Sequence, residues 1–231
     1  MTSSMIDIPS QDGKSFKGYL ALPPTGTGPG IVLIQEIFGV NNHIKAVADQ
    51  YALDGYVVLA PDLFWRQQPG VDLGYTEADM GSAMGFMQNT DFPLAILDLT
   101  ATVATLRTHA ACTGKVASIG YCMGGLLSYL SAANAGVDAA ICYYAGAIET
   151  QLDQAEKVTC PILFHFAEKD HYISPAAVKA VQEKFADVKT AVIEVYPGVD
   201  HGFNCWERPA YNQKASSLAH GLSLSFLSKA Y

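Results

Sequence analysis

Short apolar runs alternate with helix-like segments along most of this chain, and this alternation limits the possible folds most strongly. Six continuous runs are predicted to be strands because they are short and rich in Val, Ile and Leu; they cover residues 30–38, 56–64, 115–122, 138–146, 161–170 and 191–198. Five helices are predicted around residues 42–53, 93–109, 123–135, 175–186 and 210–229. Such a pattern is typical of an α/β fold with a mostly parallel central sheet and helices on both faces.

The remaining segments suit the same single domain. Residues 5–24 predict two short strands joined around Asp12-Gly13, a common pair in hairpin turns. Residues 63–90 are less regular and glycine-rich, and we expect a loop or a partial lid there. The chain has 231 residues, of which 50% are apolar and 16% charged. One α/β domain over residues 1–231 with a full core is therefore expected.

Charge and cysteine content restrict the partners. The net charge is −8 and no basic stripe is present, so nucleic acid is not an expected partner. The five cysteines include no C-x-x-C pair, and no histidine pair has metal-ligand spacing, so neither a disulfide framework nor a metal site is expected. No signal peptide and no apolar run of membrane-spanning length is recognised. We expect a cytoplasmic monomer or small homo-oligomer.

Polar and nucleophilic side chains follow the predicted strands. In parallel sheets, reactive groups gather at the carboxyl ends of the strands. The residues at or just beyond those ends are Glu36, Asp62, Cys122, Asp170 and His201. We therefore expect a site along this edge of the sheet.

The stretch "SIGYCMGG" places a cysteine where a strand turns into a helix. Gly120, Cys122 and Gly124 form a G-x-C-x-G pattern, the cysteine version of the G-x-S-x-G nucleophile elbow. The positive end of the following helix favours a thiolate at this position. The backbone N–H of Met123 is expected to face a developing oxyanion, with a second donor near Ile37.

A cysteine nucleophile needs a base, and the base needs an orienting group. Asp170 and His201 follow Cys122 in the chain order nucleophile, acid, histidine that this fold uses. His171 and Asp200 are adjacent competitors for the two roles. Simple structural roles also exist, because a cysteine can be a core residue and an aspartate can cap the helix that begins after Ser174.

Several motifs together resemble the dienelactone hydrolase (carboxymethylenebutenolidase) family of the α/β-hydrolase superfamily. The resemblance runs over nearly the whole chain and includes "VLIQEIFGVNNHIKAVADQYALDGYVVLAPDLFWRQQPG", "IGYCMGG", "CYYAG", "LFHFAEKDHYISP" and "YPGVDHGF". It implies a catalytic triad of Cys122, Asp170 and His201, with oxyanion donors at the amides of Ile37 and Met123. It further implies that Glu36 lies near the thiol and controls its ionisation, and that Tyr144 lines the pocket. A strand-end glutamate bonded to a nearby amide is the simpler alternative for Glu36.

The chain departs from the family pattern at two arginines that hold the substrate carboxylate. One is expected a few residues before "GFMQ", where this chain reads "EADMGSAM", and the other four residues after the histidine, where this chain has Cys205. Arg208 or Arg66 is close enough in sequence to replace them, although either can be a surface ion pair. Trp65, Phe203 and Trp206 are expected to form an apolar pocket wall or to pack in the core.

The resemblance implies a hydrolase that opens enol-lactones or esters through a cysteine thiolate and a thioester, without a bound cofactor. The missing arginines keep open a broader carboxylesterase with a different, uncharged substrate. Two further alternatives are a non-catalytic binding relative and a redox-sensing thiol in which Cys205 resolves Cys122.

Overall fold

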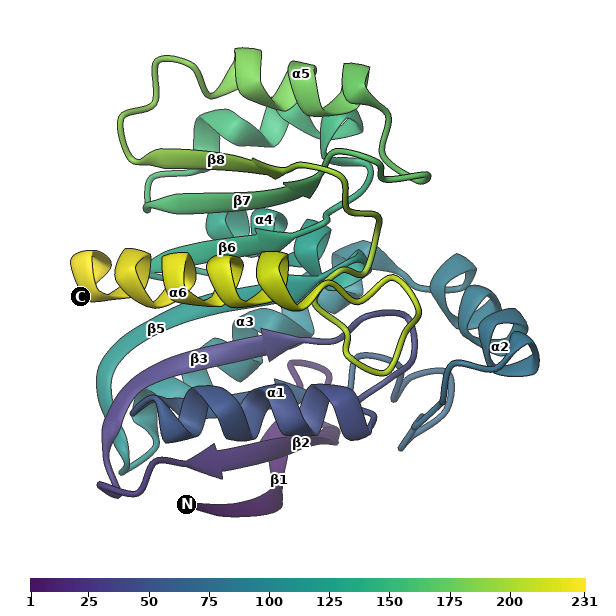
Figure 1. Ribbon diagram of the computed structural model, residues 1–231. Coiled ribbons are helices and arrows are strands. Elements are labelled where there is room, and N and C mark those ends of the chain that lie inside the picture. Colours follow the sequence, from purple (N-terminus) through teal and green to yellow (C-terminus); the bar gives the residue numbers. More distant parts are fainter.

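The computed structural model describes all 231 residues, and its strands form one sheet with helices on both faces (Figure 1). The sheet order is β1-β2-β4-β3-β5-β6-β7-β8. Its strands are β1 (Thr2–Pro9), β2 (Ser15–Leu22), β3 (Gly28–Ile34), β4 (Val57–Pro61), β5 (Cys112–Tyr121), β6 (Ala139–Tyr143), β7 (Ile162–Ala167) and β8 (Ala191–Tyr196). β1, β2 and β4 pair antiparallel, and the pairs from β4 to β8 are parallel, so the predicted mostly parallel sheet is confirmed.

The chain forms six α-helices. They are α1 (Asn42–Leu53), α2 (Glu77–Gln88), α3 (Phe92–Thr108), α4 (Met123–Asn134), α5 (Pro175–Lys184) and α6 (Gln213–Ala230), with short 3₁₀ turns at Ile148–Thr150 and Leu152–Lys157. α1 and α6 lie on one face, and α3 and α4 on the other (Figure 1). None of these helices combines the length and the apolar character that crossing a bilayer requires.

The core explains why the central strands are continuous apolar runs. Every residue of β4, β6 and β7 is buried, because helices cover both faces of these strands. One hydrophobic cluster of 65 buried residues spans the sheet and the inner faces of the helices. This packing fixes the strand ends, and therefore the residues that follow them, at one edge.

α2 occupies the second half of the segment that we expected to be irregular, and that expectation was wrong for residues 77–88. Thr76 and Asp79 form a capping box, in which each side chain accepts from the backbone N–H of the other residue. Gly81 and Gly85 misled the prediction, since glycine in a helix costs only about 1 kcal/mol. α2 lies beyond the carboxyl ends of the strands, apart from the main layers (Figure 1).

Candidate active site

Cys122 lies on a sharp turn between β5 and α4. Its φ of 56° and ψ of −118° are unfavourable for a residue with a side chain, and they lift the thiol above the sheet edge. A Cβ on Gly120 would overlap the carbonyl of Gly124, and a Cβ on Gly124 would overlap the carbonyl oxygens of Ile34 and Gln35. Both glycines of the G-x-C-x-G pattern are thus required by close backbone contacts.

His201 and Asp170 form a buried hydrogen-bonded pair beside this turn. Nδ1 of His201 lies 2.9 Å from Oδ2 of Asp170, in loops that follow β8 and β7. The other oxygen of Asp170 accepts from the backbone N–H groups of Tyr172 and Ile173 at 2.9 and 3.0 Å. Since both carboxylate oxygens are held, the imidazole has a fixed orientation with Nε2 free of any hydrogen bond inside the protein.

The neighbouring pair of His171 and Asp200 forms a separate contact. Nδ1 of His171 lies 2.8 Å from Oδ1 of Asp200, and this oxygen also accepts from the backbone N–H of His201 at 2.6 Å. Asp200 therefore holds the His201 backbone and not its ring. The structure brings Asp170, rather than Asp200, to the His201 imidazole.

The surroundings of His201 favour its charged form. Burial alone disfavours an imidazolium, but the electrostatic influence of the nearby Cys122 side chain and the hydrogen bond to Asp170 outweigh it and raise the pKa of His201 to about 10.

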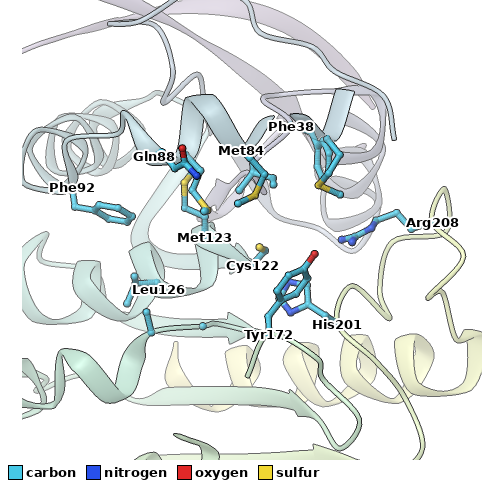
Figure 2. A pocket seen from close by; sticks show the side chains of 15 residues that line it. Phe38, Met84, Gln88, Phe92, Cys122, Met123, Leu126, Tyr172, His201 and Arg208 are labelled. Carbon is cyan, nitrogen blue, oxygen red and sulfur yellow. The ribbon is translucent and has the colours of Figure 1, made fainter. Parts of the chain in front are cut away.

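Cys122 and His201 line one cavity of about 470 Å³ (Figure 2). Ile37 and Met123 line the same cavity, so both predicted oxyanion donors belong to residues beside the thiol. Met123 is the first residue of α4, where backbone N–H groups have no intrahelical acceptor.

Glu36 is fully buried beside this cavity and does not line it. Neither carboxyl oxygen has a hydrogen-bond partner, and the closest charge is Nη1 of Arg208, 3.6 Å from Oε1. Burial raises the pKa of Glu36, and the charges of Arg208 and His201 oppose this rise only in part. Glu36 is not bonded to a nearby amide, which was the simpler alternative.

Arg208 points into the cavity from the loop between β8 and α6 (Figure 2). Its guanidinium makes no hydrogen bond to the protein and lies above Gly202, where a Cβ would come within 2.6 Å of Nη1. Phe38 lies under the guanidinium, 5.8 Å from ring centre to Cζ. Arg208 is thus the one arginine that reaches the Cys122 cavity.

Arg66 and Trp65 lie elsewhere, and the structure does not bring them to Cys122. Asp98 on α3 accepts from Arg66 at 2.8 and 3.0 Å and from Nε1 of Trp65 at 2.8 Å. Asp12 pairs with the remaining end of the guanidinium at 2.7 Å. Each of the three guanidinium nitrogens of Arg66 donates in this network, which ties the first hairpin to α3.

Tyr144 and Phe203 support the site from behind. Both are fully buried and neither lines the cavity; we expected Tyr144 to line it, and Phe203 takes the core-packing alternative rather than the pocket wall. The Tyr144 ring meets the His201 ring edge-on at 4.9 Å and the Phe203 ring at 5.4 Å. Tyr144 has an unusual φ of 35°, and its ring contacts the His201 ring rather than the cavity.

Sequence reasoning missed most of the apolar lining. The cavity is also lined by Phe38, Met80, Met84, Met87, Phe92, Leu126 and Tyr172. The three methionines recur at positions i, i+4 and i+7, a spacing that places side chains on one face of a helix. That spacing was the available signal, and the glycines of α2 obscured it.

The parallel sheet and the elbow between strand and helix define an α/β-hydrolase. The sequence profile of the Dienelactone hydrolase family matches residues 16–231. The chain therefore belongs to the dienelactone hydrolase family and is a hydrolase of the dienelactone hydrolase type, which acts on small-molecule esters or lactones.

Individual relatives match over their full length. Carboxymethylenebutenolidase 1 of Cupriavidus pinatubonensis is 31% identical, and the match covers 98% of this chain and 97% of the relative. The Pseudomonas putida carboxymethylenebutenolidase is 33% identical with the same coverage.

Solved structures share the fold. A Klebsiella pneumoniae protein provisionally named a dienelactone hydrolase superposes with a TM-score of 0.86 at 25% identity, covering 98% of each chain. A dienelactone hydrolase-like promiscuous phosphotriesterase from metagenomic libraries superposes with a TM-score of 0.82 at 21% identity, over 99% of this chain and 98% of the other. The second likeness is one of fold alone.

Proposed function

We propose that this chain opens enol-lactones or cleaves related carboxylic esters with Cys122 as the nucleophile and a thioester as the intermediate. One observation carries the proposal. Cys122 shares its cavity with His201, and His201 is held by Asp170 at 2.9 Å. The proposal also draws on the carboxymethylenebutenolidases that the chain resembles over their whole length.

The reaction follows from this arrangement in two halves. His201 accepts the thiol proton, and Sγ of Cys122 adds to the substrate carbonyl, whose oxygen becomes negative. The amides of Ile37 and Met123 stabilise that oxygen; removing one such donor typically costs about 10²- to 10³-fold in rate. The carbon–oxygen ester bond then breaks, and the leaving oxygen takes the proton from Nε2 of His201.

His201 acts as the base again when the thioester is hydrolysed. His201 accepts a proton from water, the resulting hydroxide adds to the thioester carbonyl, and Sγ leaves and takes the proton back. In a lactone the leaving oxygen stays tethered and can close the ring again. An enol leaving group avoids this because it tautomerises to a ketone, which favours enol-lactones as substrates.

Glu36 and Arg208 are proposed to control the charge beside the thiol. The carboxyl oxygens of Glu36 have no hydrogen-bond partner, and a charged Glu36 opposes a free thiolate at Cys122 by like-charge repulsion. Arg208 has free donors facing the cavity and can hold a carboxylate of the substrate in a bidentate contact. Arg208 would then replace an arginine that the family pattern places elsewhere in the sequence.

Ring opening of cis- and trans-dienelactone by the purified protein, with Cys122→Ala in parallel, tests the proposal. We expect turnover that Cys122→Ala abolishes. Cys122-dependent cleavage of neutral activated esters without dienelactone turnover would instead establish the broader esterase. Full activity in Cys122→Ala would overturn the cysteine mechanism.

Two other functions receive less support. A non-catalytic relative is inconsistent with a thiol that iodoacetamide alkylates rapidly, and we expect such alkylation at Cys122. A redox pair with Cys205 is disfavoured because Cys205 is fully buried, and burial, together with the charge of Glu36, raises the pKa of its thiol to about 12.

A further inference from the structure

The cavity has two chemically different sides, and Cys122 lies between them (Figure 2). His201 and Arg208 lie on one side of the thiol. Phe92 and Leu126 lie on the other side of the thiol, and Met84 lies above it in this view (Figure 2). We define the methionine wall as the apolar lining residues Met80, Met84, Met87, Phe92 and Leu126. A substrate bound at Cys122 must therefore place different groups against the two sides.

Only an uncharged group suits the methionine wall. Gln88 is the one polar side chain among the lining residues of α2, and no lining residue of α2, α3 or α4 is charged. An anionic group there would be removed from water without a partner, which is strongly unfavourable. Apolar surface buried against the same side chains is stabilised.

The direction of the reaction assigns the two sides to the two halves of the substrate. His201 delivers its proton to the leaving oxygen, so the leaving group lies on the side of His201 and Arg208. The acyl group extends from the other side of the carbonyl carbon, towards Leu126 and Phe92. We infer that the methionine wall binds an uncharged, apolar acyl chain and so determines the substrate class.

This inference rests on the proposed function, since it assigns the acyl half of a thioester. It also explains the departure from the family pattern on α2. The segment "EADMGSAM" presents methionines to the cavity, and methionine adapts its shape to irregular apolar groups. The wall should accept a range of chain lengths.

A series of p-nitrophenyl esters tests the inference with the intact protein. We expect kcat/KM to rise by about threefold for each methylene added between the acetate and the hexanoate. The mono-p-nitrophenyl ester of adipic acid has the same six acyl carbons with a terminal carboxylate. We expect its kcat/KM to lie at least ~10-fold below that of the hexanoate, because its carboxylate has no partner at the wall.

Two variants of α2 test whether the preference for apolar acyl chains arises at the methionine wall. Met84→Arg should lower the hexanoate-to-acetate ratio of kcat/KM by at least ~10-fold and raise the adipate-to-hexanoate ratio, because a bidentate partner for the carboxylate is supplied. Ser82→Arg puts the same charge on the exposed face of the same helix and should leave both ratios unchanged.

The possible results distinguish a failure of this inference from a failure of the proposed function. Cys122-dependent turnover with equal kcat/KM for all acyl chains would overturn the methionine wall and leave the proposed function intact. Equal kcat/KM for the adipate ester and the hexanoate would also overturn the methionine wall and leave the proposed function intact. Absence of Cys122-dependent turnover of every ester, with the protein folded, would overturn both. The wild-type series decides the matter even if Met84→Arg does not fold.

Discussion

Arg208 and Glu36 form a loose ion pair at the edge of the Cys122 cavity, with Nη1 of Arg208 lying 3.6 Å from Oε1 of Glu36. Neither the guanidinium nor the carboxyl group makes a hydrogen bond to another protein group. Glu36 is fully buried, whereas Arg208 reaches the cavity. An anionic group that enters the cavity can therefore bind Arg208 without first breaking a strong hydrogen bond.

Arg208→Gln tests this anion site. Loss of a charge-assisted contact is worth about 1.5–3 kcal/mol. We expect kcat/KM for a carboxylate-bearing lactone to fall by roughly 10- to 100-fold relative to its value for a neutral ester, measured by steady-state kinetics.

Arg107→Gln is the matched control, because Arg107 pairs with Asp138 at the surface. It should leave the ratio of the two substrates unchanged. Equal losses for the carboxylate-bearing lactone and the neutral ester in Arg208→Gln would contradict an anion-binding role.

The variant Arg66→Met tests whether Arg66 stabilises the fold or binds the substrate. Asp98 is 2% exposed and would lose the cation of its network. We expect the free energy of unfolding to fall by about 2–3 kcal/mol in urea titrations, because a buried carboxylate is left unpaired. kcat/KM should stay within about twofold of wild type, since Arg66 does not reach the cavity.

Arg107→Met provides the comparison for stability. Its partner Asp138 is 23% exposed, and exposed ion pairs contribute about 0–1 kcal/mol. A similar loss in both variants, or a selective loss of activity in Arg66→Met, would refute the structural assignment of Arg66.

The buried His43 is expected to lower the free energy of unfolding at acidic pH. It is buried on α1 against Trp206, both ring nitrogens lack partners, and burial together with repulsion from Arg208 lowers its pKa to about 4. The unfolded chain, with the ordinary pKa of 6.5, binds the proton more tightly. Stability is therefore lost as the pH falls from about 6.5 to 4.

His43→Phe should remove that part of the acid sensitivity and keep an aromatic contact with Trp206. Between pH 7 and pH 4, wild type should lose about 2–3 kcal/mol more than the variant, measured by urea unfolding. His165 is also buried, and burial lowers its pKa to about 3. Because His165 is present in both proteins, its effect on stability does not contribute to the difference between them. Parallel losses in the two proteins would exclude His43 as the source.

Short sequence patterns were sufficient to predict the parts of this site that depend on nearby residues. The G-x-C-x-G turn depends on backbone contacts within a few residues and on one neighbouring strand, so Cys122 was identifiable. Asp170 and His201 follow apolar strands, and parallel strands bring their ends to one edge. The fold followed from the same alternation of strands and helices.

The parts that could not be predicted depend on partners from distant elements. Arg66 and Arg208 looked alike in sequence, and only Asp98 on α3 and Glu36 after β3 distinguish them. Tyr144 was expected at the pocket surface, but its ring contacts the His201 ring instead. The apolar side of the cavity was missed because two glycines concealed the helical spacing of the α2 methionines.

The central claim is that Cys122 carries the acyl group. Rapid acid quenching of the protein during turnover of p-nitrophenyl hexanoate, followed by intact mass measurement and peptide mapping, tests it most directly. We predict a mass increase of one hexanoyl group on the peptide that contains Cys122, which disappears once substrate is exhausted and is absent in Cys122→Ala. An acyl group on another residue, or undiminished turnover in Cys122→Ala, would contradict the account.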